Sequence, residues 1–474
     1  MGVIEVQEAN RVLCFYYAAM HYAFCGGRRE GHDPVRLSYL TPVFSLDYPI
    51  LTPNLKLTDT ENGMRKRSID IVLIGCVCVI LLRLLGCSGD DKTTNPVDTI
   101  NPVDTMKLSG VVSANENFGF KLLADLHKRD ADKNIFISPL SVSIALTMAY
   151  NGAAGETQRA MAKVLEIEGM DLQTINRANA QLREDLENPD AKVELAIANS
   201  IWAREDVEFN ADFLDRNRAF FDAQIATLNF SNPQAPGRIN QWVDTNTKGK
   251  IQKIMDQIPP NVVMFLINAV YFKGRWQVEF DKSETQDGVF HLSDGTEKQV
   301  PMMRREGGYP YFLAENFEAV SLSYGEGRVS MYVFLPAPDA NLNGFVERLN
   351  AENWANWLPQ FREVRDDSVI VMPRFKLEYE VILNDALKAL GMDIAFGGGA
   401  NFEDLAPRGL FISEVKHKTF VEVNEEGTEA AAVTVVSVAK SFPPTFIVDR
   451  PFFFAIRDNQ TGAMLFMGIV IEPM

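Results

Sequence analysis

The sequence of 474 residues is 46% hydrophobic and 23% charged, a composition that supports a well-buried core and argues against wholesale disorder. A formal net charge of −17 disfavours any partner held through its phosphates, and we therefore expect no binding to nucleic acid. All five cysteines lie within the first 87 residues, so the rest of the chain cannot be a disulfide scaffold, and their spacings do not suggest a metal site.

Residues 64–87 are typical of a secretory signal peptide. Basic residues at 65–67 precede an apolar run over 71–82, which is too short to span a bilayer as a helix. Leu84-Leu85-Gly86-Cys87 then resembles a lipobox, the motif in which the cysteine is diacylated and becomes the first residue of the mature protein. We therefore expect an exported bacterial lipoprotein, anchored through Cys87 to the outer membrane or cell surface. The alternative is a membrane-proximal apolar segment with an incidental cysteine.

The segments on either side of this signal lack the pattern of a packed domain. Residues 1–63 have no sustained periodicity, and we interpret them as an unstructured or non-native N-terminal extension. Residues 88–107 contain a duplicated unit, Asn95-Pro96-Val97-Asp98-Thr99, which recurs at 101–105. Proline, aspartate and threonine at this density predict a semi-extended polar tether.

Residues 108–474 show no composition break and are predicted to form one domain. Helical and strand patterns are interleaved without strict alternation, which favours an α+β fold. A helix is expected after Ser113, and Ser138-Pro139 predicts a second helix start, with a serine N-cap and a proline in the first turn. Strands are predicted over residues 193–202, 262–272, 329–335, 369–372, 420–423, 446–456 and 464–471.

Motifs of catalysis are missing from the sequence of this domain. It contains no G-x-S-x-G elbow, no H-E-x-x-H pair and no G-x-x-x-x-G-K loop. Its three histidines, His127, His291 and His417, accompany no recognisable nucleophile motif. We therefore expect a protein that is not an enzyme and that carries no cofactor and no metal.

The most informative stretch begins at Gly427, which gives the backbone unusual freedom. Small residues follow over 428–432 and β-branched ones over 433–438, a change that favours an extended strand. Alternate residues from Thr428 onward are small or medium-sized and mostly apolar, which suits a crowded sheet interior. Taken alone, this composition fits an ordinary buried strand better than a functional segment.

Four motifs in the same order resemble those of the serpin family. Residues 134–141 read Asn-Ile-Phe-Ile-Ser-Pro-Leu-Ser, like the family's second-helix entry, and residues 268–276 read Asn-Ala-Val-Tyr-Phe-Lys-Gly-Arg-Trp, like its central strand. Residues 425–432 resemble its proximal hinge, and 449–452 with 465–468 resemble its C-terminal signature. The resemblance covers essentially all of residues 108–474. It implies the α+β serpin fold, with a large mixed central β-sheet, two smaller sheets, about eight or nine helices and an exposed reactive loop.

The resemblance also implies a mechanism, in which the chain inhibits proteases as a suicide substrate. A target serine protease, or a cysteine protease, cuts the reactive loop and forms an acyl-enzyme; the cut loop then inserts into the main sheet as a new strand and traps the enzyme. The hinge that permits insertion corresponds to Glu425, Gly427, Thr428, Glu429, Ala430, Ala431 and Ala432. The shutter, a polar cluster that holds the central strands together, corresponds to Ser138, Ser141, Asn268 and His417.

The position of the reactive bond depends on the direction of counting. Counting back from Pro443-Pro444 gives Lys440-Ser441, and counting forward from Gly427 gives Ser441-Phe442. We favour Lys440-Ser441, because a lysine suits trypsin-like proteases, although the small apolar residues before it would suit elastase-like ones.

Further expectations concern partners and competing functions. The acidic residues over 169–192 predict no activation by heparin, and we expect a monomer. The main alternative is a non-inhibitory serpin-fold binding or chaperone protein on the cell surface, and a third reading is a plain surface adhesin. The alanines of the hinge argue against the non-inhibitory reading, since bulky or charged residues usually stand there in non-inhibitory members.

Overall fold

The computed structural model describes residues 102–473 except 188, 408 and 428–444. The predicted N-terminal extension, the predicted signal peptide with Cys87 and most of the predicted tether lie outside the described residues. So do the hinge residues from Thr428 onward and the reactive bonds around Lys440, Ser441 and Phe442. Within the described part, no helix is both long and apolar enough to cross a membrane.

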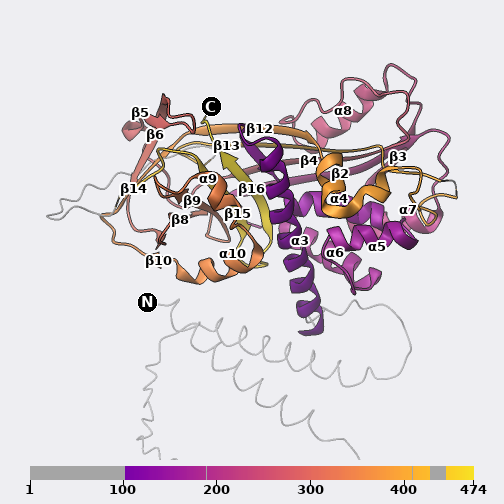
Figure 1. The fold of residues 1–474 in the computed structure, drawn as a ribbon, viewed down its shortest axis with the longest axis horizontal. Coiled ribbons are helices and arrows are strands. Elements are labelled where there is room, and N and C mark those ends of the chain that lie inside the picture. Colours follow the sequence, from indigo (N-terminus) through magenta and orange to yellow (C-terminus); the bar gives the residue numbers. More distant parts are fainter. Residues whose placement is uncertain (1–101, 188, 408, 428–444, 474) are drawn as a thin grey trace, which may run out of the picture. The chain divides into compact units, whose positions relative to one another are not determined.

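The described residues form three β-sheets, and the one that concerns function is a mixed sheet of five strands, here called the central sheet (Figure 1). Its strand order is β12-β13-β4-β2-β3. Strands β13 and β4 run parallel, as do β2 and β3, whereas the β12–β13 and β2–β4 pairs are antiparallel. The strands span Phe375–Ile382 (β12), Glu414–Val423 (β13), Met264–Gly274 (β4), Val193–Arg204 (β2) and Gln224–Leu228 (β3).

The other two sheets have seven and four strands. A seven-stranded antiparallel sheet has the order β1-β16-β15-β9-β8-β7-β10. It is built from Ile135–Ile137 (β1), Met464–Val470 (β16), Phe452–Asp458 (β15), Val329–Pro336 (β9), Phe317–Tyr324 (β8), Pro310–Leu313 (β7) and Arg362–Glu363 (β10). A four-stranded sheet has the order β14-β11-β6-β5, from Thr445–Ile447 (β14), Val369–Pro373 (β11), Glu297–Glu306 (β6) and Gln286–His291 (β5).

Nine α-helices accompany the sheets in the described part of the chain. They are α3 (Pro102–Arg129), α4 (Pro139–Tyr150), α5 (Gly155–Val164), α6 (Leu172–Glu187), α7 (Ala211–Phe221), α8 (Ala235–Asn246), α9 (Leu342–Val346), α10 (Ala351–Trp357) and α11 (Asn384–Leu387). All twelve residues of α4 are buried, because this helix packs against β2 and β4 of the central sheet and against β16 of the seven-stranded sheet. The helix therefore joins the two larger sheets.

Side chains alternate across the central strands, as a pleated strand requires. On β4, Val270 packs into the main hydrophobic core, whereas Ala269 and Tyr271 belong to a second core cluster that includes Ile239 and Val243 of α8. Helix α8 thus covers one face of the central sheet, and α4 contacts the other (Figure 1). Both faces of β4 are therefore covered, and its polar side chains are limited to Asn268 and Lys273.

The α+β fold expected from the sequence, with a mixed central sheet and two further sheets, is confirmed, with differences at the ends of elements. The first helix begins at Pro102 instead of after Ser113, so the end of the predicted tether (residues 102–107) is helical; proline is favoured at the first helical position. Strand β13 begins at Glu414, before the expected residue 420. The expected strand 446–456 is two strands in different sheets, separated around Pro451, which has no backbone N–H for a sheet ladder.

Candidate functional site

A row of buried polar residues crosses the middle of the central sheet. Strands β13 and β4 are paired in parallel over seven residue pairs, from Glu414 with Phe265 to Phe420 with Tyr271. Within this register His417 lies beside Asn268, and on the other side of β4 Asn268 lies beside Asn199 of β2. Three neighbouring strands therefore each contribute one buried polar side chain at the same level of the sheet.

Hydrogen bonds connect these side chains to the start of helix α4. The backbone N–H of Ser138 donates to Nε2 of His417 over 3.1 Å, and Nδ1 of His417 lies 2.5 Å from Oδ1 of Asn268. The amide nitrogen of Asn268 donates to Oδ1 of Asn199 over 2.6 Å and to Oγ of Ser141. The structure thus brings the four predicted shutter residues together, and Asn199 completes the network.

The network fixes the protonation state of His417. Because Nε2 accepts the Ser138 N–H, the ring proton resides on Nδ1, which donates to Asn268 Oδ1. Complete burial lowers the pKa of His417 to about 3, since the charged form would lose its hydration. The imidazole is therefore neutral at pH 7, and protonation of Nε2 would break the bond to Ser138.

Ser138 marks the expected helix boundary but acts through its backbone. Helix α4 begins at Pro139 with Ser138 as N-cap residue, yet the serine side chain makes no capping hydrogen bond. Its N–H is directed to His417 instead. Two residues further along β13, the Thr419 hydroxyl donates to the carbonyl of Phe136 in β1 over 2.5 Å. Strand β13 is therefore tied to the segment 136–138 at two points.

The hinge begins in a tight turn at the end of β13. Residues Asn424 and Gly427 form a β-bridge, with Gly427 N–H donating to Asn424 O over 3.1 Å. Gly427 has a φ of +82°, in the left-handed region. A Cβ here would lie closer than 3.0 Å to backbone atoms of Gly274, Arg275 and Trp276. Both the positive φ and the close backbone approach require glycine at this position.

Two buried glutamates hold this turn in place. Glu425 and Glu426 are 1% and 5% exposed. Glu425 forms an ion pair with Arg374 and accepts a hydrogen bond from Thr285 Oγ1 over 2.7 Å, while Glu426 pairs with Lys282. Burial alone would raise the pKa of Glu425, but the hydrogen bonds from Arg374 and Thr285 outweigh it and lower this pKa below its ordinary value. The carboxylate of Glu425 is therefore charged at pH 7.

Backbone hydrogen bonds also hold this turn in place. The carbonyl of Glu426 accepts from Trp276 N over 3.1 Å, and that of Glu425 accepts from Phe280 N over 2.8 Å. The indole Nε1 of Trp276 donates to Asn424 O over 2.9 Å. The buried Trp276 ring stacks on Tyr324 with 4.2 Å between ring centroids. The turn that ends at Gly427 is therefore fixed to the segment that follows β4.

The described structure places part of the predicted site. Of the hinge, Glu425 and Gly427 are seen in the turn, whereas residues 428–432 lie outside the described residues. The chain is described again at Thr445, where β14 joins the four-stranded sheet, so the intervening loop links two sheets.

Three residues of the site were not predicted from the sequence: Arg374 and Lys282, which contact the two glutamates, and Asn199, which extends the polar network. Asn199 could have been noticed as a polar residue inside an apolar strand pattern. No local signal identifies Arg374 or Lys282, because they lie 51 and 144 residues from the glutamates they contact.

Comparison with known proteins supports the family expected from the motifs. Residues 113–473 match the family model described as "Serpin (serine protease inhibitor)". Serpin B6 of Pongo abelii is 34% identical over 377 residues, covering 77% of this chain and 99% of that protein. The crystal structure of tengpin, a thermophilic serpin in the native state, is similar with a TM-score of 0.71 and 32% identity, covering 80% of this chain and 97% of tengpin. Human thyroxine-binding globulin is similar with a TM-score of 0.71 and 28% identity, covering 78% of this chain and 100% of that chain.

Proposed function

Because the chain belongs to the serpin family, we propose that it inhibits a serine protease as a suicide substrate. The protease nucleophile attacks a carbonyl of the loop between Gly427 and Thr445, the C–N bond breaks, and the amine of the downstream segment leaves with a proton. The upstream segment, still esterified to the enzyme, then enters the central sheet between β13 and β4. The ester is trapped before water can hydrolyse it.

The direction of the strands carries this proposal. Strand β13 ends at Val423, and the chain turns over residues 424–427. A segment that folds back from this turn runs antiparallel to β13, and because β4 is parallel to β13, it runs antiparallel to β4 as well. Insertion therefore replaces one parallel pair by two antiparallel pairs, the slightly more stable arrangement.

The free energy available from insertion is large enough to deform an enzyme. About a dozen new ladder hydrogen bonds, at about 1 kcal/mol net each, contribute roughly 10 kcal/mol. A typical domain is stable by only about 5–15 kcal/mol. The uncut protein must therefore be kinetically trapped, and the shutter network and the hinge contacts are the interactions we assign to that trap.

We assign the reactive bond to Lys440-Ser441, with Ser441-Phe442 as the alternative, and a trypsin-like enzyme as the target. The assignment depends on the count back from Pro443-Pro444 and on the lysine. Elastase-like proteases, and cysteine proteases with the same acyl-enzyme chemistry, are further candidates. Mass spectrometry of the peptide released on cleavage identifies the bond directly.

The decisive experiment mixes the purified chain with trypsin, and separately with elastase, and looks for a complex that survives boiling in detergent. The matched control is Thr428→Arg, which places a charge where the loop enters the sheet but leaves Lys440-Ser441 intact. We expect the wild type to form the complex and the variant to be cleaved without forming it. Cleavage of both chains with full recovery of protease activity would refute inhibition.

The alternative is a serpin-fold protein that binds a ligand and does not inhibit. This alternative is suggested by the similarity to thyroxine-binding globulin, a protein that was crystallised in complex with thyroxine. The small residues 428–432 favour insertion and hence inhibition. A cleaved chain whose melting temperature equals that of the uncut chain would favour the non-inhibitory alternative.

We further propose that the chain is exported and attached to the outer membrane or cell surface by a lipid on Cys87, as a monomer and without activation by heparin. The proposal rests on Leu84-Leu85-Gly86-Cys87 and on the acidic residues over 169–192. Radiolabelled palmitate should be incorporated in the wild type and not in Cys87→Ser. Incorporation in both would refute attachment at this residue.

A further inference from the structure

A groove of about 670 Å³ crosses the four-stranded sheet, which is formed by β5, β6, β11 and β14 (Figure 1). It runs from the short helix Lys282–Glu284 beside β5 to β14 at the other edge of the sheet. Its apolar lining comes from Val289, Met302, Val371 and Ile447. Ile447 is 43% exposed, although it lies in a strand. The groove therefore offers apolar surface that no other part of the described chain covers.

Carboxylates outnumber cations in this groove. Glu284, Asp287 and Asp449 line it, and Arg304 is the one lysine or arginine among its described lining residues. Arg304 is already paired with Glu284 and Glu306. Asp287 is exposed on the edge strand β5, and no ion pair is found for it in the described part of the chain. The groove therefore favours a partner segment that carries lysine or arginine next to an apolar side chain.

The groove adjoins the loop that the proposed function assigns to the protease. Strand β14 begins at Thr445, and Ile447 is seven residues beyond Lys440. Seven residues span at most about 25 Å. A protease domain of about 230 residues has a radius of gyration of about 17 Å and hence a diameter of more than about 40 Å. An enzyme seated at the reactive bond is therefore large enough to contact the groove, whichever of the two candidate bonds it cuts.

We propose that this groove binds a basic surface loop of the target protease, with an apolar side chain against Val371 and Ile447 and a lysine or arginine beside Asp287. The identity of the partner rests on the proposed function. Attraction between the acidic groove and the basic loop speeds their encounter, so the groove selects among proteases of one cleavage specificity by their surface charge. A second copy of this chain fits less well, since two such acidic grooves repel each other.

The rate constant for cleavage of the loop tests the groove. The full chain is treated with cationic and with anionic trypsin, which share a cleavage specificity and differ in surface charge, and the C-terminal fragment is followed on denaturing gels. We expect cationic trypsin to cut the wild type faster. Asp287→Lys should slow cationic trypsin about fivefold in 0.1 M salt, where the Debye length is about 10 Å, and less than about twofold in 1 M salt, where it is about 3 Å. Anionic trypsin should not be slowed.

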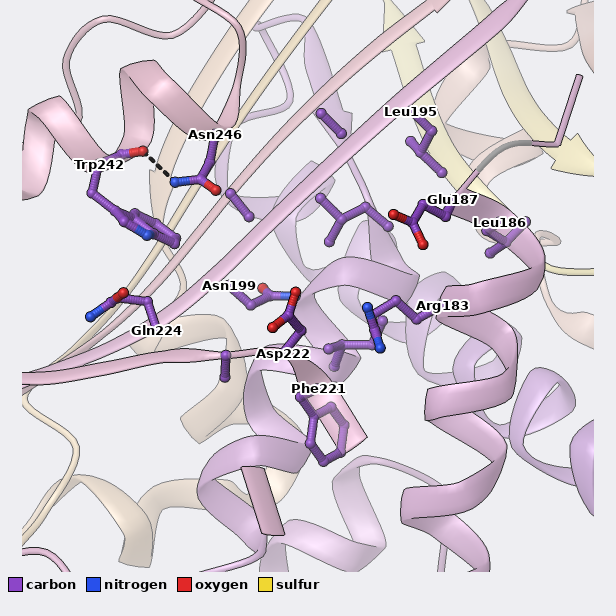
Figure 2. Close-up of a pocket in the computed structure, with 15 residues that line it drawn as sticks. Arg183, Leu186, Glu187, Leu195, Asn199, Phe221, Asp222, Gln224, Trp242 and Asn246 are labelled. Carbon is purple, nitrogen blue, oxygen red and sulfur yellow. Dashed lines mark hydrogen bonds between the residues drawn. The ribbon is translucent and has the colours of Figure 1, made fainter. Parts of the chain in front are cut away.

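Two further variants separate the groove from the net charge of the chain. Glu187→Lys changes the net charge as much as Asp287→Lys does. Glu187 is an exposed residue at the end of α6, beside a different cavity (Figure 2), and α6 lies well apart from β5 and β14 (Figure 1). We expect Glu187→Lys to be cut by cationic trypsin like the wild type. Ile447→Ser leaves the charges unchanged and should slow cleavage at both salt concentrations, because it removes apolar area from the contact.

Equal cleavage rates for the wild type and Asp287→Lys, an equal loss in Glu187→Lys, or a loop that neither trypsin cuts would overturn the proposal. A sedimentation coefficient of the chain alone that differs between the wild type and Asp287→Lys would also overturn it, because a second copy would then be the occupant. Cleavage is measured whether or not the enzyme is trapped, so the groove and the inhibitory function fail separately. Charge-dependent cleavage with release of active trypsin would support the groove and refute only the inhibitory function.

Discussion

Protonation of His417 should destabilise the uncut protein, and the lowered pKa of the buried ring determines how much stability is lost. Its pKa is lowered from 6.5 to about 3 in the folded chain, because the ring is completely buried. Below pH 6.5 the unfolded chain therefore binds a proton that the folded chain does not, and stability falls by about 1.4 kcal/mol per pH unit. Between pH 6.5 and pH 4.5 the loss is about 2.3 kcal/mol, because the unfolded histidine is already half protonated at pH 6.5, and it continues toward pH 3.

A variant isolates this contribution from that of other titrating groups. Burial raises the pKa of Glu116 on α3 to about 7, so this carboxyl stabilises the fold as the pH falls from 7 and opposes the effect of His417. His417→Gln cannot titrate, and its amide can accept from Ser138 N–H and donate to Asn268. The contribution of Glu116 is common to both chains and cancels in the comparison.

Urea unfolding of both chains, followed by tryptophan fluorescence from pH 7 to pH 4.5, measures the difference. We expect the wild type to lose about 2.5 kcal/mol relative to His417→Gln over this range. Parallel pH curves for the two chains would refute the argument, because they would mean that His417 titrates normally in the folded state or that water reaches it.

Other predictions concern the hinge and the shutter. Gly427→Ala should destabilise the uncut chain by at least about 1–2 kcal/mol, because residue 427 has a left-handed backbone. Melting curves should show no such loss after the loop is cleaved and the turn has opened. Equal losses before and after cleavage would contradict this prediction. Glu425→Gln should weaken the pairing with Arg374 and cost about 1–3 kcal/mol in urea unfolding at pH 7, and 1 M salt should reduce this loss only in part, because the carboxylate is buried. Asn268→Ala leaves several buried partners unsatisfied and should cost about 3 kcal/mol, measured by urea unfolding, with faster spontaneous inactivation of the uncut chain.

The sequence was sufficient where a local pattern had one physical solution. Ser138-Pro139 combines a residue that favours the N-cap with one that favours the first turn, and α4 begins there. The apolar runs around Val270 and Val333 form β4 and β9. Short continuous apolar runs are typical of strands that are buried on both faces. The shutter residues were grouped only through the family resemblance, since 279 residues separate Ser138 from His417.

Features that depend on tertiary contacts could not be predicted. The break between β14 and β15 falls at Pro451, and beside it the Arg450 side chain donates through Nε to the distant Pro336 O over 2.9 Å. The burial of Glu425 and Glu426 depends on Arg374 and Lys282 from distant segments. Strand β3 pairs with β2 only over Ser200 to Arg204, and no local pattern in the sequence sets that limit.

The order of strands in the seven-stranded sheet bears on how the protein is made. Strands β15 and β16 are the last two in the described chain, yet they lie between β1, near its beginning, and β9. During synthesis β1 therefore has no neighbour in its sheet until residues 464–470 have left the ribosome, although every strand of the central sheet is already available. Folding of this half must wait for the end of translation, and nascent chains halted before residue 464 should remain sensitive to added protease.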